Sequence, residues 1–282
     1  DNPIIQEDGA SIVGSGTSSA QRILFGDSTI TNLNISNLSF ALGYIAFYNK
    51  CDVNFSGTWN FTLNSSSGSM FRIMAEGGTV NLGNAVINAN KTGGGYSAAL
   101  FNFTNSTGPA TINLDSAVIN VSNAANSTLQ IFKRSNNAAV STLNPGTSTI
   151  NISTSSSEGV IIGDGPNPLN LNNLNVNNSA GKTIYFNNLG YDGITPMVYN
   201  VANLSLEGAS DNNLRLRSTT EGSSYALNLT GGAYNLKYLD VKDCDASGGK
   251  KIITAASTDS GNNRNWVFSD VIGVLWINYS GD

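Results

Sequence analysis

Short apolar bursts separated by polar, turn-forming residues run along almost the whole chain. The bursts are rich in β-branched and aromatic residues, and within them apolar and polar positions alternate. This alternation is typical of half-buried β-strands, and the Gly, Ser, Asn, Asp and Pro between the bursts are typical of turns. No stretch combines the apolar period of an amphipathic helix with helix caps. The pattern therefore predicts an all-β chain.

The bursts recur in groups of three, as the segments TVNLGNAVINAN (79–90) and TINLDSAVINVSN (111–123) illustrate. Successive groups begin roughly 26–32 residues apart, a spacing typical of solenoid repeats. One coil cannot bury its own apolar face, whereas a stack of coils can. We therefore predict a right-handed parallel β-helix with three sheets and about eight coils, stacked about 4.8 Å apart.

The repeat also sets the expected domain boundaries. Residues 1–28 are interpreted as an N-terminal segment with a partial first coil or cap, residues 29–265 as the β-helix, and residues 266–282 as an apolar strand. A strand over residues 271–279 would be apolar on both faces, and its own last coil could cover only one of them. It would act either as a cap or, by adding to a neighbouring subunit, as a head-to-tail contact. The predicted contact residues are Val271, Ile272, Val274, Leu275, Trp276, Ile277 and Tyr279.

Asn recurs at one position in the first strand of most coils. Its apolar neighbours are expected to point inward, so the Asn side chains should face outward. Two structural interpretations remain: a solvated polar face, or a ladder in which each amide bonds the amide of the next coil. The residues are Asn54, Asn81, Asn113, Asn170, Asn200 and Asn228.

The composition of the chain argues against several classes of function. Only 12% of the residues are charged, and 14 Lys and Arg stand against 19 Asp and Glu, which argues against a nucleic-acid partner. The chain has no His, which excludes Ser-His-Asp catalysis and His metal sites. No apolar run is long enough for a membrane span. Because the chain opens without Met, we interpret it as a mature exported protein whose signal peptide has been removed.

One acidic group could bind a metal. The segment DVKDCD places Asp240, Asp243 and Asp245 close together, and such oxygen ligands could hold Ca²⁺. Strand alternation would instead send them to different faces, as ordinary turn and surface carboxylates. No other cofactor is expected.

Three further groups of residues have both a structural and a functional interpretation. Cys51 and Cys244 stand several coils apart, too far for a disulfide within one straight solenoid, so they are either buried or free thiols or form a bond between subunits. Sequons that could be glycosylated include Asn34, Asn60, Asn102, Asn126 and Asn151. Aromatic residues could stack on sugars, although their varying place in the repeat favours packing roles; they are Tyr44, Tyr48, Trp59, Tyr96, Tyr185, Tyr191, Tyr225, Tyr234 and Tyr238.

Two patterns resemble a known family. The coil pattern xINLxxxxINVxN resembles the β-helical surface proteins and adhesins of bacteria, over most of the chain. The segment YLDVKDCDASGGKKIITAASTDSGNNRNWVF (238–268) is similar to the closing module of very large bacterial surface proteins with this fold. The resemblance implies an extracellular, non-enzymatic role and specifies no ligand.

Two functions are therefore expected. The first is an extracellular structural protein whose protomers join head to tail into a surface filament or sheath. The second is a monomeric adhesin or carbohydrate-binding module of a larger surface protein, whose partner would be a cell-surface or matrix polysaccharide. A polysaccharide-degrading enzyme is disfavoured, because the acids are scattered and the Gly-His-Gly element of polygalacturonases cannot exist without His.

Overall fold

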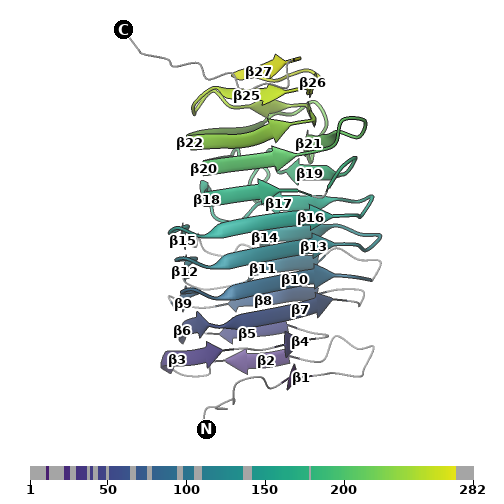
Figure 1. The fold of residues 1–282 in the computed structure, drawn as a ribbon. Helices are drawn as coiled ribbons and strands as arrows, with labels where there is room; N and C mark the ends of the chain where they lie inside the picture. The colour runs from purple at the N-terminus through teal and green to yellow at the C-terminus, as the bar shows by residue number, and fades with distance from the viewer. Residues whose placement is uncertain are drawn as a thin grey trace.

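The computed structural model describes residues 11–12, 22–25, 30–36, 39–40, 44–48, 51–63, 68–74, 78–93, 98–104, 110–135, 142–177 and 179–270. Every regular element among them is a β-strand, and the strands form three parallel sheets. In Figure 1, the front strands run from left to right, the fainter strands behind them run back, and the chain rises from its N-terminus to its C-terminus. The described residues thus form a right-handed parallel β-solenoid, which confirms the predicted fold.

We call the three sheets A, B and C. Sheet A contains β1 (Ser11–Ile12), β4 (Ser39–Phe40), β7 (Thr58–Leu63), β10 (Val86–Lys91), β13 (Val118–Asn123), β16 (Thr149–Thr154), β18 (Leu169–Val176), β20 (Val198–Glu207), β22 (Tyr225–Lys237), β25 (Ile252–Ala255) and β27 (Trp266–Ser269), with β24 (Cys244–Asp245) also paired to β22. Sheet B contains β2 (Arg22–Phe25), β5 (Tyr44–Tyr48), β8 (Gly68–Met74), β11 (Ala98–Thr104), β14 (Leu129–Ser135), β17 (Val160–Gly163), β19 (Thr183–Phe186), β21 (Leu214–Ser218), β23 (Leu239–Val241) and β26 (Thr258–Asp259). Sheet C contains β3 (Ile30–Ser36), β6 (Cys51–Ser56), β9 (Thr79–Asn81), β12 (Thr111–Asn113) and β15 (Thr142–Asn144).

The number of coils differs from the expected eight. Among the described strands, sheet B stacks ten and sheet C only five, so that about five coils have all three sheets. Strands β1 and β2 pair with β4 and β5, and β27 pairs with β25. Solenoid strands therefore extend into both of the segments that were expected to flank the β-helix.

Sheet C ends because its corner turn is lost. In the lower coils, Gly83, Asp115 and Gly146 occupy the turn between sheets C and A, each with φ near +50°. A Cβ at Gly146 would lie 2.2 Å from the Asp115 carbonyl oxygen, so this stacked turn needs a residue without a side chain there. The segment LNLNNLNV of β18 has no such turn, and it runs as one strand that pairs with β16 and β20.

The core fills the inside of the coils with apolar and aromatic side chains. Phe101 stacks on Phe132 with ring centroids 5.4 Å apart, and Phe186 stacks on Tyr225 at 4.6 Å. Each ring thus meets another ring from a different coil, which adds to the burial of apolar area. The inward alternation predicted from the bursts produces this continuous core.

The side chain of Lys91 lies inside the solenoid. Lys91 is fully buried, and its Nζ donates to Ser127 Oγ at 2.5 Å and to the Gly93 carbonyl at 3.0 Å. Burial lowers the pKa of Lys91. Lys91 lies in register with Asn123, which is also buried and donates to the carbonyls of Ser127 and Gly159. These polar side chains tie neighbouring coils together at a turn.

Candidate functional site

Amide ladders follow the outer face of sheet C and, further along the chain, strands β18, β20 and β22 of sheet A. Asn81 Nδ2 donates to Asn54 Oδ1 at 2.8 Å, and Asn113 Nδ2 donates to Asn81 Oδ1 at 2.6 Å. The column continues with Asn144, which donates to Asn113 at 2.7 Å. The other three residues of the expected set form a separate column, in which Asn200 donates to Asn170 at 2.9 Å and Asn228 donates to Asn200 at 3.0 Å. The six predicted residues thus lie in two columns.

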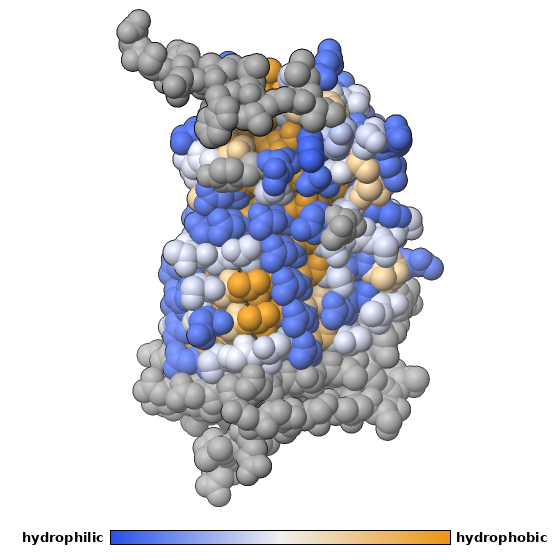
Figure 2. All heavy atoms as spheres, viewed as in Figure 1, coloured by the Kyte–Doolittle hydropathy of each residue, from blue (hydrophilic) through white to orange (hydrophobic). Residues whose placement is uncertain are grey.

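A further ladder, which the sequence analysis did not include, crosses the outer face of sheet A. Its steps join Asn88 to Asn60 at 2.8 Å, Asn120 to Asn88 at 2.9 Å, Asn151 to Asn120 at 2.9 Å and Asn175 to Asn151 at 3.0 Å. Figure 2 shows a column of hydrophilic residues along this face. The sequence signal was the Asn shared by the second bursts AVINA, AVINV and STINI. Because each amide bonds its neighbours, the ladders stabilise the stack.

The three aspartates lie apart as turn and surface carboxylates, and the alternative of a calcium site does not fit their contacts. Asp240 accepts hydrogen bonds from Arg217 and Ser260, whereas Asp243 is buried and accepts from Gly222 N and Asn262 Nδ2. Asp245 accepts from Ser247 N, and hydrogen bonding by the side chain and then the backbone of Ser247 lowers the pKa of Asp245. Strand alternation turns the three carboxylates to different partners, and no group of three metal-binding side chains occurs among the described residues.

Of the two interpretations of the cysteines, the buried free thiol fits Cys244, and the disulfide between subunits does not. This residue is a free cysteine with no exposed surface. Burial raises the pKa of its thiol to about 12, so the thiol is protonated at neutral pH. Cys51 lies in β6, and its side chain is outside the described residues.

The predicted sequons differ in accessibility. Asn60 and Asn151 belong to the ladder on sheet A, and Asn102 is buried in β11. Asn126 is exposed in the segment after β13, and its glycosylation stays a prediction. Asn34 lies in β3, and nothing further is described of its side chain. The predicted contact residues between 271 and 279 lie outside the described residues, so that contact stays a prediction.

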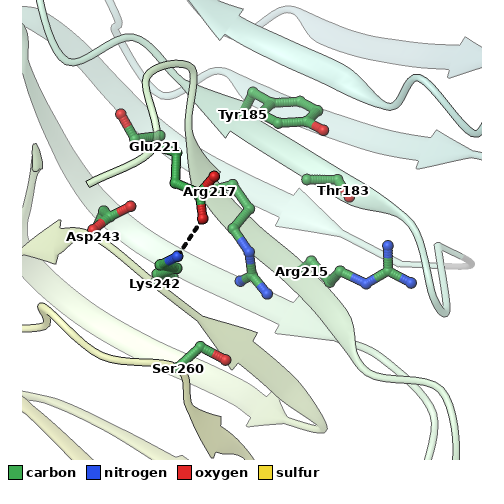
Figure 3. Close-up of a pocket in the computed structure, with 9 residues that line it drawn as sticks. Thr183, Tyr185, Arg215, Arg217, Glu221, Lys242, Asp243 and Ser260 are labelled. Atoms are coloured by element: carbon green, nitrogen blue, oxygen red, sulfur yellow. Dashed lines mark hydrogen bonds and ion pairs between the residues drawn. The ribbon is translucent and has the colours of Figure 1, made fainter. Parts of the chain in front are cut away.

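An open cleft lies on the outer face of sheet B near the C-terminal coils. Its volume is about 540 Å³, within the range of about 300–1,000 Å³ for small-molecule sites. Figure 3 shows side chains that converge on it from several neighbouring coils. The lining residues are Thr183, Tyr185, Arg215, Arg217, Ser218, Glu221, Lys242, Asp243 and Ser260.

Ion pairs organise the charges of the cleft. Arg217 Nη2 lies 2.5 Å from Asp240 Oδ2, and Lys242 Nζ lies 2.6 Å from Glu221 Oε1. The hydrogen bond from Lys242 lowers the pKa of Glu221, and the same bond raises the pKa of Lys242.

Of the cleft residues, Tyr185 was among the aromatic residues considered for sugar stacking, whereas Arg215 and Arg217 were not predicted from the sequence. Their signal was the burst LRLRS, which places two outward cations in one strand of a chain poor in charge.

Comparison of the chain with protein-family models, with curated proteins and with solved structures finds no match. Among the described residues, no helix has the length and apolar character that a membrane crossing requires. The case for a function therefore rests on the solenoid, on its ends and on the cleft.

Proposed function

We propose that the protein is an extracellular structural protein whose solenoid protomers join end to end into a surface filament or sheath. The observation that supports this proposal is the open edge at β27. Among the described strands, β27 pairs only with β25, and Ile252 N and Ala256 N donate to the carbonyls of Asn265 and Ser269. Because hydrogen bonding alternates along a parallel strand, the backbone groups of Trp266 and Phe268 face away from β25. Such an edge accepts an added strand.

The apolar residues 271–279 follow this edge directly in the chain. Addition of this segment to a neighbouring protomer would cover both of its faces and supply backbone partners. A head-to-tail contact of this kind does not close on itself, so it propagates into a fibre.

Electron microscopy of the purified full chain tests the proposal. We expect filaments from the full chain and a folded, soluble monomer after deletion of residues 271–282. The substitution Asn126→Ala, at an exposed turn residue, is the matched control and should leave assembly intact. A full chain that stays monomeric at high concentration would contradict the proposal, as would a truncated chain that still polymerises.

A second function is a monomeric adhesin or carbohydrate-binding module of a larger surface protein. The cleft on sheet B favours it, because an aromatic side chain and several charged groups converge there. A glycan array probed with the truncated monomer tests this function separately from assembly.

A further inference from the structure

Register places the cleft's side chains in two rows on the outer face of sheet B. Tyr185 pairs with Arg217 across β19 and β21, while Thr183 pairs with Arg215 in the neighbouring row. Arg215 pairs in turn with Asp240 of β23. Figure 3 shows Thr183 between the Tyr185 ring and Arg215. An aromatic ring and a guanidinium group therefore border the same patch of polar surface.

Arg215 differs from the other two cations of the cleft. Asp240 lies beside it in register, but the Asp240 carboxylate is engaged by Arg217 through Oδ2 and by Ser260 through Oδ1. Arg215 is exposed, and no ion pair joins it to any side chain of the described residues. Its guanidinium thus presents a planar set of donors, which matches the geometry of a carboxylate.

The wall of the cleft is held in place before any ligand arrives. Glu221 stands on the loop between β21 and β22, where Gly222 N donates to Asp243 Oδ2 at 2.9 Å. Asp243 is 1% exposed, and its other oxygen accepts from Asn262 Nδ2 at 2.8 Å. The buried carboxylate of Asp243 thus holds the loop that carries Glu221 against the core. Such preorganisation reduces the entropy lost on binding.

The equal numbers of positive and negative side chains around the cleft favour some classes of ligand over others. The three cations Arg215, Arg217 and Lys242 face three carboxylates, those of Glu221, Asp240 and Asp243. A multiply charged phosphate therefore finds no excess of positive charge. A ligand with one carboxylate on an uncharged polyhydroxyl body finds one available guanidinium, with polar groups and an aromatic ring beside it.

We propose that this cleft binds a uronic acid residue of an acidic polysaccharide. Arg215 pairs with the sugar carboxylate, the Tyr185 ring packs on the C–H face of the pyranose, and Glu221 accepts hydrogen bonds from hydroxyl groups. The inference deepens the second function above, because it specifies the class of saccharide, and it is independent of assembly through the ends.

Isothermal titration calorimetry on the full chain tests the proposal with three probes: an oligogalacturonate, its methyl ester and sodium acetate. We expect the oligogalacturonate to bind at low salt, the neutral ester to bind at least about tenfold more weakly, and acetate to show no binding, because it lacks the sugar ring. Arg215→Gln should remove the preference for the acid over the ester. Tyr185→Ala should weaken both saccharides, because both stack on the ring.

The matched control is Lys251→Gln, which removes an exposed cation outside the cleft and should leave binding unchanged. Circular dichroism of each variant establishes that it is folded. Equal affinity for acid and ester, or unchanged selectivity in Arg215→Gln, would overturn the uronate proposal while leaving carbohydrate binding in place. Failure of both saccharides to bind would overturn the uronate proposal, and the glycan array would then decide whether the protein binds another carbohydrate.

Discussion

The outer face of sheet A and the cleft on sheet B use their polar side chains in opposite ways. On sheet A, Asn88, Asn120 and Asn151 repeat the same group at the same position, and each amide bonds the next. In the cleft, neighbouring coils carry different groups: Thr183 lies beside Arg215, and Arg215 beside Asp240. Repetition satisfies the polar groups within the stack, whereas variation leaves donors and acceptors for a ligand.

This contrast separates a structural surface from the proposed recognition surface within one fold. An amide column presents little selectivity, because every member has the same chemistry and is already hydrogen-bonded along the axis. A cleft built from single, unrepeated residues can distinguish ligands by the placement of each group. In a solenoid, the positions that depart from the repeat are therefore the first to examine for binding.

The largest expected effect is the protection of the Cys244 thiol, which lies in the core next to the cleft residues Lys242 and Asp243. Because burial raises the pKa of Cys244 to about 12, its thiolate fraction at pH 8 should be more than about a thousandfold below that of an ordinary cysteine. Thiol labelling with a chromogenic disulfide, carried out on a Cys51→Ser variant, should show protection of at least this size. Labelling should become fast only in denaturant; fast labelling of the native protein would show that the C-terminal coils open readily.

Substitution of Asp243, which anchors the loop of the cleft, should lower the free energy of unfolding more than substitution of one ladder residue on sheet A. Asp243→Ala leaves the donors of Gly222 and Asn262 without their carboxylate, and we expect a loss of about 3 kcal/mol in the free energy of unfolding. Asp243→Asn, which keeps one acceptor oxygen, should lose less. Urea denaturation measures both values, and Asp245→Ala, a partly exposed neighbour, should change stability by well under half as much.

One ladder residue should make a smaller contribution. Asn120→Ala removes the hydrogen bonds to Asn88 and from Asn151, so we expect a loss of about 1–2 kcal/mol by the same measurement. The control is Asn126→Ala, which replaces an exposed turn residue outside the ladder and should have almost no effect. Equal losses in the two variants would indicate that the amide column adds nothing to stability.

The smallest effect is the response of the cleft wall to acid. The hydrogen bond from Lys242 lowers the pKa of Glu221 below the ordinary 4.5, so this pairing favours the folded state above pH 4.5 and is lost as the pH falls through the lower, folded-state pKa. A carboxyl-detected NMR titration should give a Glu221 midpoint below 4.5. In Lys242→Gln the midpoint should return towards that value; an unshifted midpoint in the unmodified protein would show that the pair does not form in solution.

Local pattern was sufficient for the strands, because alternation decides which side chains point inward. Short bursts such as TVN and TIN became β9 and β12, and their Asn side chains face outward as the alternation requires. The same logic covers Asn200 and Asn228. These features depend only on neighbours along the chain, and many of the described coils repeat them.

Turn length and register decide which side chains from different coils become neighbours. No single apolar burst contains this information. Loss of the corner turn in β18 separates the column of Asn113 from that of Asn170, although both residues follow the same local pattern. The sequence group DVKDCD suggested one acidic site, but register gave Asp240 to Arg217 and buried Asp243 beneath a loop. Residues as distant in the chain as Thr183 and Ser260 share a cleft only because each coil returns to the same sheet. The sequence by itself determined the strands and their inward and outward faces; the stacking of coils, through long-range pairing, decided the site.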